Sequence, residues 1–156
     1  MQNLNQATQK VTKLHFLHPP STAHEYAAMA QTNSTDSLAT LFGQIYIKDD
    51  PLTIGLELSS ELVSYAQGIT TSAFVEELIL FEPFTFVFTN KAYNGSTLVV
   101  LASNPTLHKY RELLIVDGTR VFHLAHELVS YLTYAYNSIS GDYTIGVDMV
   151  VLHYYL

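Results

Sequence analysis

Four histidines stand in two pairs that could carry out proton chemistry. His15 and His18 lie near the start of the chain, and His123 and His126 repeat their spacing much later. An imidazole ordinarily has a pKa of about 6.5, so it can take up or release a proton near neutral pH. These side chains are therefore candidate general acids and bases.

Aromatic side chains form the second group of candidates. Tyr93 stands beside Asn94-Gly95, a hairpin turn signal, so its ring either lines the mouth of a pocket or only flanks the turn. Tyr65 offers a second hydroxyl donor in another apolar run. Phe86 belongs to a row of alternating phenylalanines, a pattern that fits either a ligand platform or a simple core. We take Tyr93 as a catalytic candidate, and Tyr65 and Phe86 as substrate contacts.

A zinc site built from the histidines is a weaker alternative. Side chains of a strand alternate between its two faces, so His15 and His18 would point in opposite directions. The same alternation puts His123 on the face of Val121 and His126 on the other, unless a bulge intervenes. The chain has no cysteine and hence no thiolate ligand. We expect no metal and no cofactor, and each histidine taken singly also fits a surface or structural role.

Composition indicates the class of protein that must position these groups. The chain has 156 residues, the size of one domain, and 48% of them are hydrophobic, with 11 Tyr and 8 Phe. This excludes a largely disordered chain. Seven Lys and Arg against 14 Asp and Glu give a net charge of −7 without a basic stripe, which argues against nucleic-acid binding. No apolar run reaches the roughly 18 residues of a membrane span.

Short apolar runs rich in Val, Ile, Phe, Tyr and Thr predict β-strands, and turn signals such as Asp117-Gly118 separate them. A helix is the weaker alternative at residues 23–30 and 74–80. Many strands without long helices indicate an antiparallel barrel or sandwich, and an eight-stranded barrel can enclose one small ligand. The predicted strands are residues 11–18, 40–47, 62–71, 84–89, 97–102, 121–136 and 143–154.

Polar segments divide the chain. Residues 1–10, 19–37 and 49–59 are predicted loops. We expect residues 1–10 to form a flexible tail and residues 11–156 to form a single domain. The first ten residues also lack the apolar stretch of a secretory signal, so the chain is either cytosolic or has lost its signal.

Several motifs in one order carry a resemblance to a known family. They are FGQIYIKDDPLTIGLELSSELVSYAQG (residues 42–68), FTFVFTNKAYNGSTL (84–98), NPTLHKYREL (104–113), IVDGT (115–119) and VVLHY (150–154). Over roughly residues 15–154 the chain resembles the dirigent proteins of plants. The resemblance implies an eight-stranded antiparallel β-barrel with a central cavity, as in allene oxide cyclases, that forms a homotrimer. It also implies secretion to the apoplast, with the signal peptide absent from this chain. The sequons Asn94-Gly95-Ser96 and Asn33-Ser34-Thr35 fit a secreted glycoprotein.

The chain departs from the family at positions with chemical roles. In lignan-forming dirigent proteins an Asp follows the His that ends the first strand, whereas this chain has His18-Pro19. A second Asp and an Arg of the family correspond to Val121 and His126. The resemblance implies that His18, Pro19, Tyr65 and Val121 contact the substrate. Our hypothesis is that His123 and His126 replace the lost proton donors, with Tyr93 as a hydroxyl donor.

Three functions remain open. The first is a dirigent-type protein that controls the stereochemistry of coupling or cyclisation of a small aromatic intermediate, a phenoxy radical or a quinone methide, in plant specialised metabolism. A laccase or peroxidase would supply the radicals. The second is a cofactor-free cyclase, isomerase or dehydratase, similar to pterocarpan synthases, with His as acid and base. The third is a non-catalytic protein of the cell wall or of defence. Whether the protein accelerates a reaction or only directs it stays open.

Overall fold

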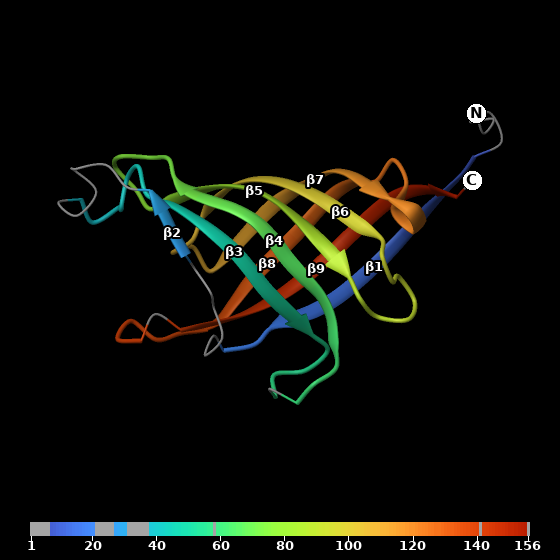
Figure 1. Cartoon of the computed structure of the whole chain (residues 1–156), viewed down its shortest axis with the longest axis horizontal. Helices are drawn as coiled ribbons and strands as arrows, with labels where there is room; N and C mark the ends of the chain where they lie inside the picture. Colours follow the sequence, from blue (N-terminus) through green and yellow to red (C-terminus); the bar gives the residue numbers. More distant parts are fainter. Residues whose placement is uncertain (1–6, 21–26, 31–37, 58, 141, 156) are drawn as a thin grey trace.

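The computed structural model describes residues 7–20, 27–30, 38–57, 59–140 and 142–155, and these form one antiparallel sheet (Figure 1). Hydrogen bonding joins the strands in the order β1-β9-β8-β7-β6-β5-β4-β3-β2. A short 3-10 helix, η3 (Arg120–Phe122), links β7 to β8. The strands are β1 (Thr8–His18), β2 (Ala27–Ala30), β3 (Ile45–Thr53), β4 (Leu62–Ser72), β5 (Ile79–Phe88), β6 (Thr97–Pro105), β7 (Tyr110–Thr119), β8 (His126–Tyr136) and β9 (Tyr143–Tyr155).

Pairing between the first and third strands closes the sheet. Leu17 of β1 lies opposite Thr53 of β3, so β1 and β3 to β9 form a ring of eight strands. The short β2 pairs with residues 45–47 at the other end of the same edge of β3. The predicted eight-stranded antiparallel β-barrel is therefore confirmed, and the chain is folded as its period-two apolar pattern requires.

One end of the barrel is filled by an aromatic plug, which we define as Phe16, Phe88, Tyr93, Phe122 and His153. The ring of Phe122 lies 5.2 Å from that of Phe88, 5.1 Å from that of Tyr93 and 5.4 Å from the imidazole of His153. The start of β1 and the finish of β9 lie side by side at this end in Figure 1. The plug leaves the opposite end of the barrel as the place where a ligand can enter.

The structure differs from the sequence-based expectations at the Asp117-Gly118 turn signal. This dipeptide lies inside β7, a strand that the strand prediction omitted, and the actual reversal is η3. A Cβ at Gly118 would stand 2.3 Å from the carbonyl oxygen of Phe122, so glycine is needed because the reversal folds back onto the strand. Residues 121–125, expected in the next strand, belong to this reversal and to the segment after it, where Leu124 has a φ of 55°.

Other boundaries also shift. Residues 49–53, expected in a loop, complete β3, and residues 8–10 of the expected tail begin β1. The helical alternatives are wrong where the structure describes them, because residues 27–30 form β2 and residues 79–80 begin β5 after a turn. Residues 1–6 and 23–26 lie outside the described part. Within that part, no helix has the length and apolarity needed to cross a membrane.

Candidate functional site

The barrel end opposite the aromatic plug holds a cavity of about 620 Å³, which we call the barrel pocket. It lies among the first residues of β5, β7 and β9, the last residues of β4, β6 and β8, and the body of β3. Its volume falls in the range typical of small-molecule sites. Apolar side chains such as Leu52, Leu80 and Val147 share its wall with four tyrosines and six other ionisable residues. These are Tyr46, Tyr131, Tyr136, Tyr143, His18, Lys48, Asp50, Glu82, Lys109 and Arg111.

Strand alternation explains why charged side chains reach the interior. Lys48 and Asp50 share the inner face of β3 with Leu52, and all three are buried. On β5, Glu82 occupies the same face as Phe84 and Phe86. Burial of a charge is costly unless it is paired, so each of these groups needs a partner in the pocket wall.

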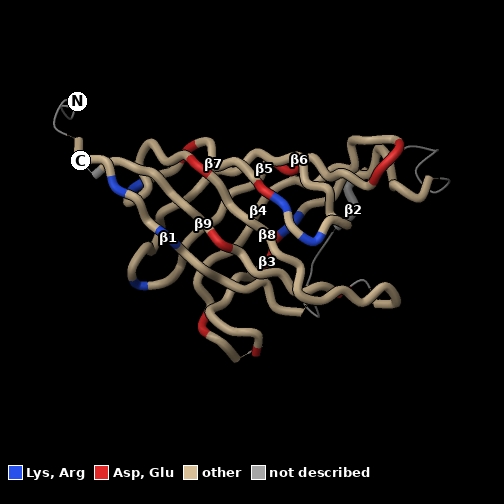
Figure 2. The backbone as a smooth tube through the Cα atoms, turned by 180° about the vertical axis from the view of Figure 1, so that it is seen from behind, with Lys and Arg blue, Asp and Glu red and all other residues tan. Residues whose placement is uncertain are grey.

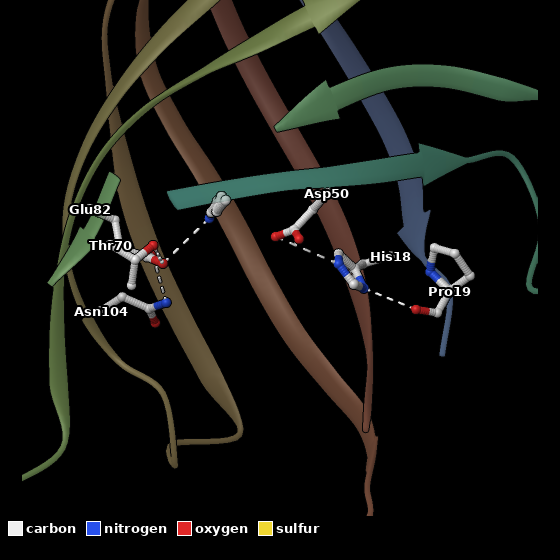
Figure 3. A network of polar contacts seen from close by, with 7 residues as sticks. His18, Pro19, Asp50, Thr70, Glu82 and Asn104 are labelled. Carbon is white, nitrogen blue, oxygen red and sulfur yellow. Dashed lines mark hydrogen bonds and ion pairs between the residues drawn. The ribbon is translucent and has the colours of Figure 1, made fainter. Parts of the chain in front are cut away.

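Glu82 is the centre of a buried polar network (Figure 3). Its Oε1 accepts hydrogen bonds from Lys48 Nζ at 3.3 Å and from Thr70 Oγ1 at 3.2 Å. Its Oε2 accepts one from Asn104 Nδ2 at 2.8 Å. Three donors from three strands thus hold one carboxylate in a fixed position. Lys48 Nζ also lies 3.9 Å from the centre of the Phe84 ring, a cation–π contact.

His18 and Asp50 form a second buried pair in the same view (Figure 3). His18 Nδ1 is 3.0 Å from the carbonyl oxygen of Pro19, and because a carbonyl only accepts, Nδ1 carries a hydrogen and donates it. The second ring nitrogen, Nε2, faces Asp50. This atom lies 3.8 Å from Asp50 Oδ2, and the imidazole packs against Tyr143 with ring centres 5.0 Å apart.

Arg111 supplies a third polar feature. Its Nη1 donates to the carbonyl oxygen of Thr106 and its Nη2 to Thr133 Oγ1, both at 2.8 Å. Burial lowers the pKa of the guanidinium, and nearby Tyr131, Glu82 and Tyr143 partly offset this, so the group stays charged near neutral pH. Within the described residues, Arg111 Nε and Asn104 Oδ1 are buried without a hydrogen-bond partner. A ligand that carries both a donor and an acceptor could satisfy them.

Tyr46 is a neutral hydroxyl of the pocket. Burial raises the pKa of its phenol above the usual value of 10.0, so the side chain keeps its proton over the physiological range. It can therefore donate a hydrogen bond to a bound oxygen.

Four of the predicted site residues lie at the plugged end rather than in the barrel pocket. Tyr93 packs in the plug, Val121 is 39% exposed in η3, and His123 is half-buried just after it. His126 is exposed, and its Nδ1 lies 3.3 Å from the carbonyl oxygen of Leu124. The structure therefore brings these residues near one another, at the opposite ends of β7 and β8 from the pocket.

The remaining predicted residues are divided. His18 lines the pocket, and Pro19 is buried beside it and accepts its Nδ1 hydrogen bond. Phe86 is fully buried in the core, next to the Phe84 ring. Tyr65 is half-buried and alternates with Ala66, whose side chain faces the pocket, so Tyr65 lies on the outer surface. His15 also lies outside, 2.7 Å from Asp148 Oδ1, on the opposite face from His18, as alternation predicts.

Sequence reasoning missed most of the pocket's polar groups. Asp50, Arg111, Lys48 and Glu82 were not among the candidate residues that it proposed. The available signal was their position: each takes the place of an apolar residue on the inner face of a strand. Among the described residues there is no cluster of three or more His, Cys, Asp and Glu placed to bind a metal ion.

Comparison with known protein families gives a match over most of the chain. The profile of the family described as dirigent-like protein matches residues 11–152. Pterocarpan synthase 1 of Glycyrrhiza echinata is 37% identical over 150 residues, which cover 94% of this chain and 80% of that protein. Dirigent protein 21 of Arabidopsis thaliana is 35% identical over 147 residues, which cover 92% of this chain and 78% of that protein.

Solved structures agree with the sequence matches. One pterocarpan synthase dirigent protein superimposes with a TM-score of 0.88 at 34% identity, covering 99% of this chain and 98% of its own. A second gives a TM-score of 0.82 at 35% identity, covering 94% and 97%. A pyocyanin demethylase, with a TM-score of 0.56 and 9% identity over 90% of this chain and 99% of its own, shares the fold alone.

Proposed function

Because the chain belongs to the dirigent family, we propose that its barrel pocket binds a small aromatic intermediate and sets the stereochemistry of its ring closure or coupling. The observation that carries this proposal is the pairing of His18 with Asp50 in the wall of a cavity large enough for such a ligand. Aromatic and aliphatic walls can orient a flat molecule, and orientation alone can decide which face reacts.

The same pair favours the cofactor-free acid–base form of this function. Neither residue stands at the family's acid positions, which are Pro19 and Val121 here. His18 and Asp50 together can give a proton and take one back, because Nε2 and the carboxylate face each other across 3.8 Å. That distance exceeds a direct hydrogen bond, so a ligand oxygen lying against both atoms can exchange a proton with either.

A dehydrative ring closure fits these groups, as the pterocarpan synthases among the relatives suggest. The pair gives a proton to a hydroxyl on a benzylic carbon, the C–O bond breaks, and water leaves. A phenol oxygen of the same molecule then forms a new bond to that carbon and returns its proton to the pair. The substrate loses one water, the protein ends as it began, and no oxidant is needed.

A stereochemical guide without its own chemistry is the second candidate, and the largely apolar pocket wall favours it. An external laccase or peroxidase would then supply phenoxy radicals, and the protein would change only the product ratio. The third candidate, a non-catalytic wall or defence protein, would be favoured by a pocket filled with its own side chains. The 620 Å³ cavity gives it no such support.

One experiment separates these candidates. A phenolic benzylic alcohol that can close to a pterocarpan is incubated with the protein, without oxidant, and the rate and handedness of the product are measured by chiral chromatography. The acid–base proposal expects faster conversion than in buffer. A guide leaves that rate unchanged and alters only the product ratio when a laccase is added to a coupling phenol. No effect in either assay would contradict the proposed function.

Assembly and location follow from the family resemblance as further proposals. Exposed apolar residues cross the outer surface, and Leu101 of β6 lies opposite Leu114 of β7 in the register, 43% and 62% exposed. Such a surface fits a contact between copies in a homotrimer.

Lys and Arg are scattered over separate strands and turns in Figure 2. Secretion to the apoplast and glycosylation at the exposed Asn94 belong to the same proposal.

A further inference from the structure

Lys48 is a buried cation in the wall of the barrel pocket, a position where lysine is rare unless it is paired. Its side chain is 5% exposed and ends 3.3 Å from Glu82 Oε1 and 3.9 Å from the centre of the Phe84 ring. Thr70 and Asn104 hold the Glu82 carboxylate through their own hydrogen bonds. The position of the ammonium group is therefore fixed before any ligand arrives.

The ammonium group has more donors than the described residues use. It carries three N–H groups, of which Glu82 accepts one, and the face of the Phe84 ring attracts the charge. Among the described residues, Glu82 alone forms a hydrogen bond or an ion pair with Lys48 Nζ. The Glu82 carboxylate also accepts hydrogen bonds from Thr70 and Asn104, so it compensates the positive charge of Lys48 only in part. In apolar surroundings such a cation attracts an oxygen that bears negative charge.

We propose that Lys48 binds the ionised ring hydroxyl of the aromatic ligand, with Glu82 as its positioning residue. This role of Lys48 rests on the proposed function, because it assumes that the aromatic ligand binds in the barrel pocket. It restricts the substrates to phenols with an acidic ring hydroxyl. Lys48 and Asp50 leave the same face of β3 two residues apart, roughly 6.5 Å along the strand. A ring that places its phenolate on Lys48 therefore extends toward Asp50 and His18, where the proton chemistry is proposed.

The probe is 4-nitrophenol, whose phenolate absorbs visible light while the neutral form does not, and its methyl ether, 4-nitroanisole, is the neutral control ligand. A cation beside the oxygen favours the phenolate, so bound 4-nitrophenol should ionise at a lower pH than the free compound. Lys48→Met should abolish this shift and weaken phenolate binding by at least about tenfold, while 4-nitroanisole binds as before. Lys91→Met, which removes a lysine from the exposed β5–β6 turn, should change neither quantity.

A second variant tests the role of Lys48 if the Lys48→Met protein does not fold. Lys48→Met/Glu82→Gln removes both charges and keeps a partner for Thr70 and Asn104, and it should show the same loss of the phenolate shift. Unshifted ionisation of the bound probe in the wild-type protein, or an unchanged shift in the double variant, overturns the role of Lys48 while leaving an aromatic pocket. Failure of the wild-type protein to bind either probe overturns the proposed function as well.

Discussion

Nε2 of His18 and Oδ2 of Asp50 lie 3.8 Å apart at the seam where β1 meets β3. The adjoining residue, Leu17, pairs with Thr53, and that pairing closes the barrel. The two side chains proposed to exchange protons come from strands that are separated by 26 residues of sequence, residues 19–44, and they meet only when the ring is complete. The site is therefore a product of closure, and no local segment contains it.

Replacement of either member of this pair should slow the reaction without emptying the pocket. His18→Gln and Asp50→Asn keep size and polarity but remove proton exchange, which contributes about 10² to 10⁴ in rate. We expect kcat to fall by a factor of that order. Binding of 4-nitroanisole, measured by titration calorimetry, should change less than about threefold. A variant that loses binding and rate in parallel would show that the pair shapes the pocket instead.

Alanine variants at the plugged end test the catalytic roles predicted from sequence. His126 is exposed, so His126→Ala should change the free energy of unfolding by less than about 0.5 kcal/mol. We expect His123→Ala and His126→Ala to retain the turnover of the wild-type protein, because both positions lie at the far end of the barrel from the pocket. Turnover that falls tenfold or more in a folded variant would move the chemistry to the plugged end, as the sequence-based hypothesis has it.

The fold could be predicted from sequence because period-two alternation is a local signal. The row Phe84, Phe86 and Phe88 is buried as that pattern predicts. The strand β7 was not predicted, because Asp117-Gly118 has the composition of a turn. The extended conformation of this dipeptide is fixed by the reversal that follows, which packs onto Gly118. Tertiary contact here overrode local preference.

The site could be predicted only in part. His18 was recognised by residue type and motif, and it does line the pocket. Lys48 and Glu82 were not, because their pairing spans 34 residues of sequence and a charged residue on a strand also fits a solvent-facing position. Inward orientation follows from register, which depends on strand partners that one sequence does not reveal.

Removal of Glu82 should be far more damaging than neutralisation of the whole ion pair. Glu82→Ala leaves the ammonium of Lys48 buried without its carboxylate, and breaking a buried pair in this way costs about 3–5 kcal/mol. Lys48→Met/Glu82→Gln leaves no buried charge at this point and should be within about 2 kcal/mol of the wild-type protein. Urea unfolding followed by circular dichroism measures both. Equal losses in the two variants would mean that the network stabilises the fold through hydrogen bonds rather than charge pairing.

Stability toward acid should depend on His153 in the aromatic plug. This imidazole is fully buried, and its Nε2 lies 2.9 Å from Thr12 Oγ1. Its ring plane makes an angle of 78° with the ring plane of Phe122, a T-shaped contact. Burial lowers the pKa of His153, Lys10 lowers it further, and a backbone contact with Val121 partly offsets both. Lys10 is its register partner on β1, so the nearest charge on the adjoining strand also opposes protonation.

The sign of the pH effect follows from that lowered pKa. Below about pH 6.5 the unfolded chain binds a proton at this position before the folded protein does, so the free energy of unfolding falls as the pH falls.

The variant Thr12→Val/His153→Leu tests this effect, because it replaces the imidazole and its hydrogen-bond partner by apolar side chains. We therefore expect a shallower loss of stability between about pH 7.5 and about pH 5 than in the wild-type protein. Urea unfolding at each pH, followed by tyrosine emission because the chain has no Trp, gives both slopes. The surface pairs His15–Asp148 and His108–Glu77 are common to both proteins, so the difference isolates His153. Identical slopes would show that the acid sensitivity does not come from His153.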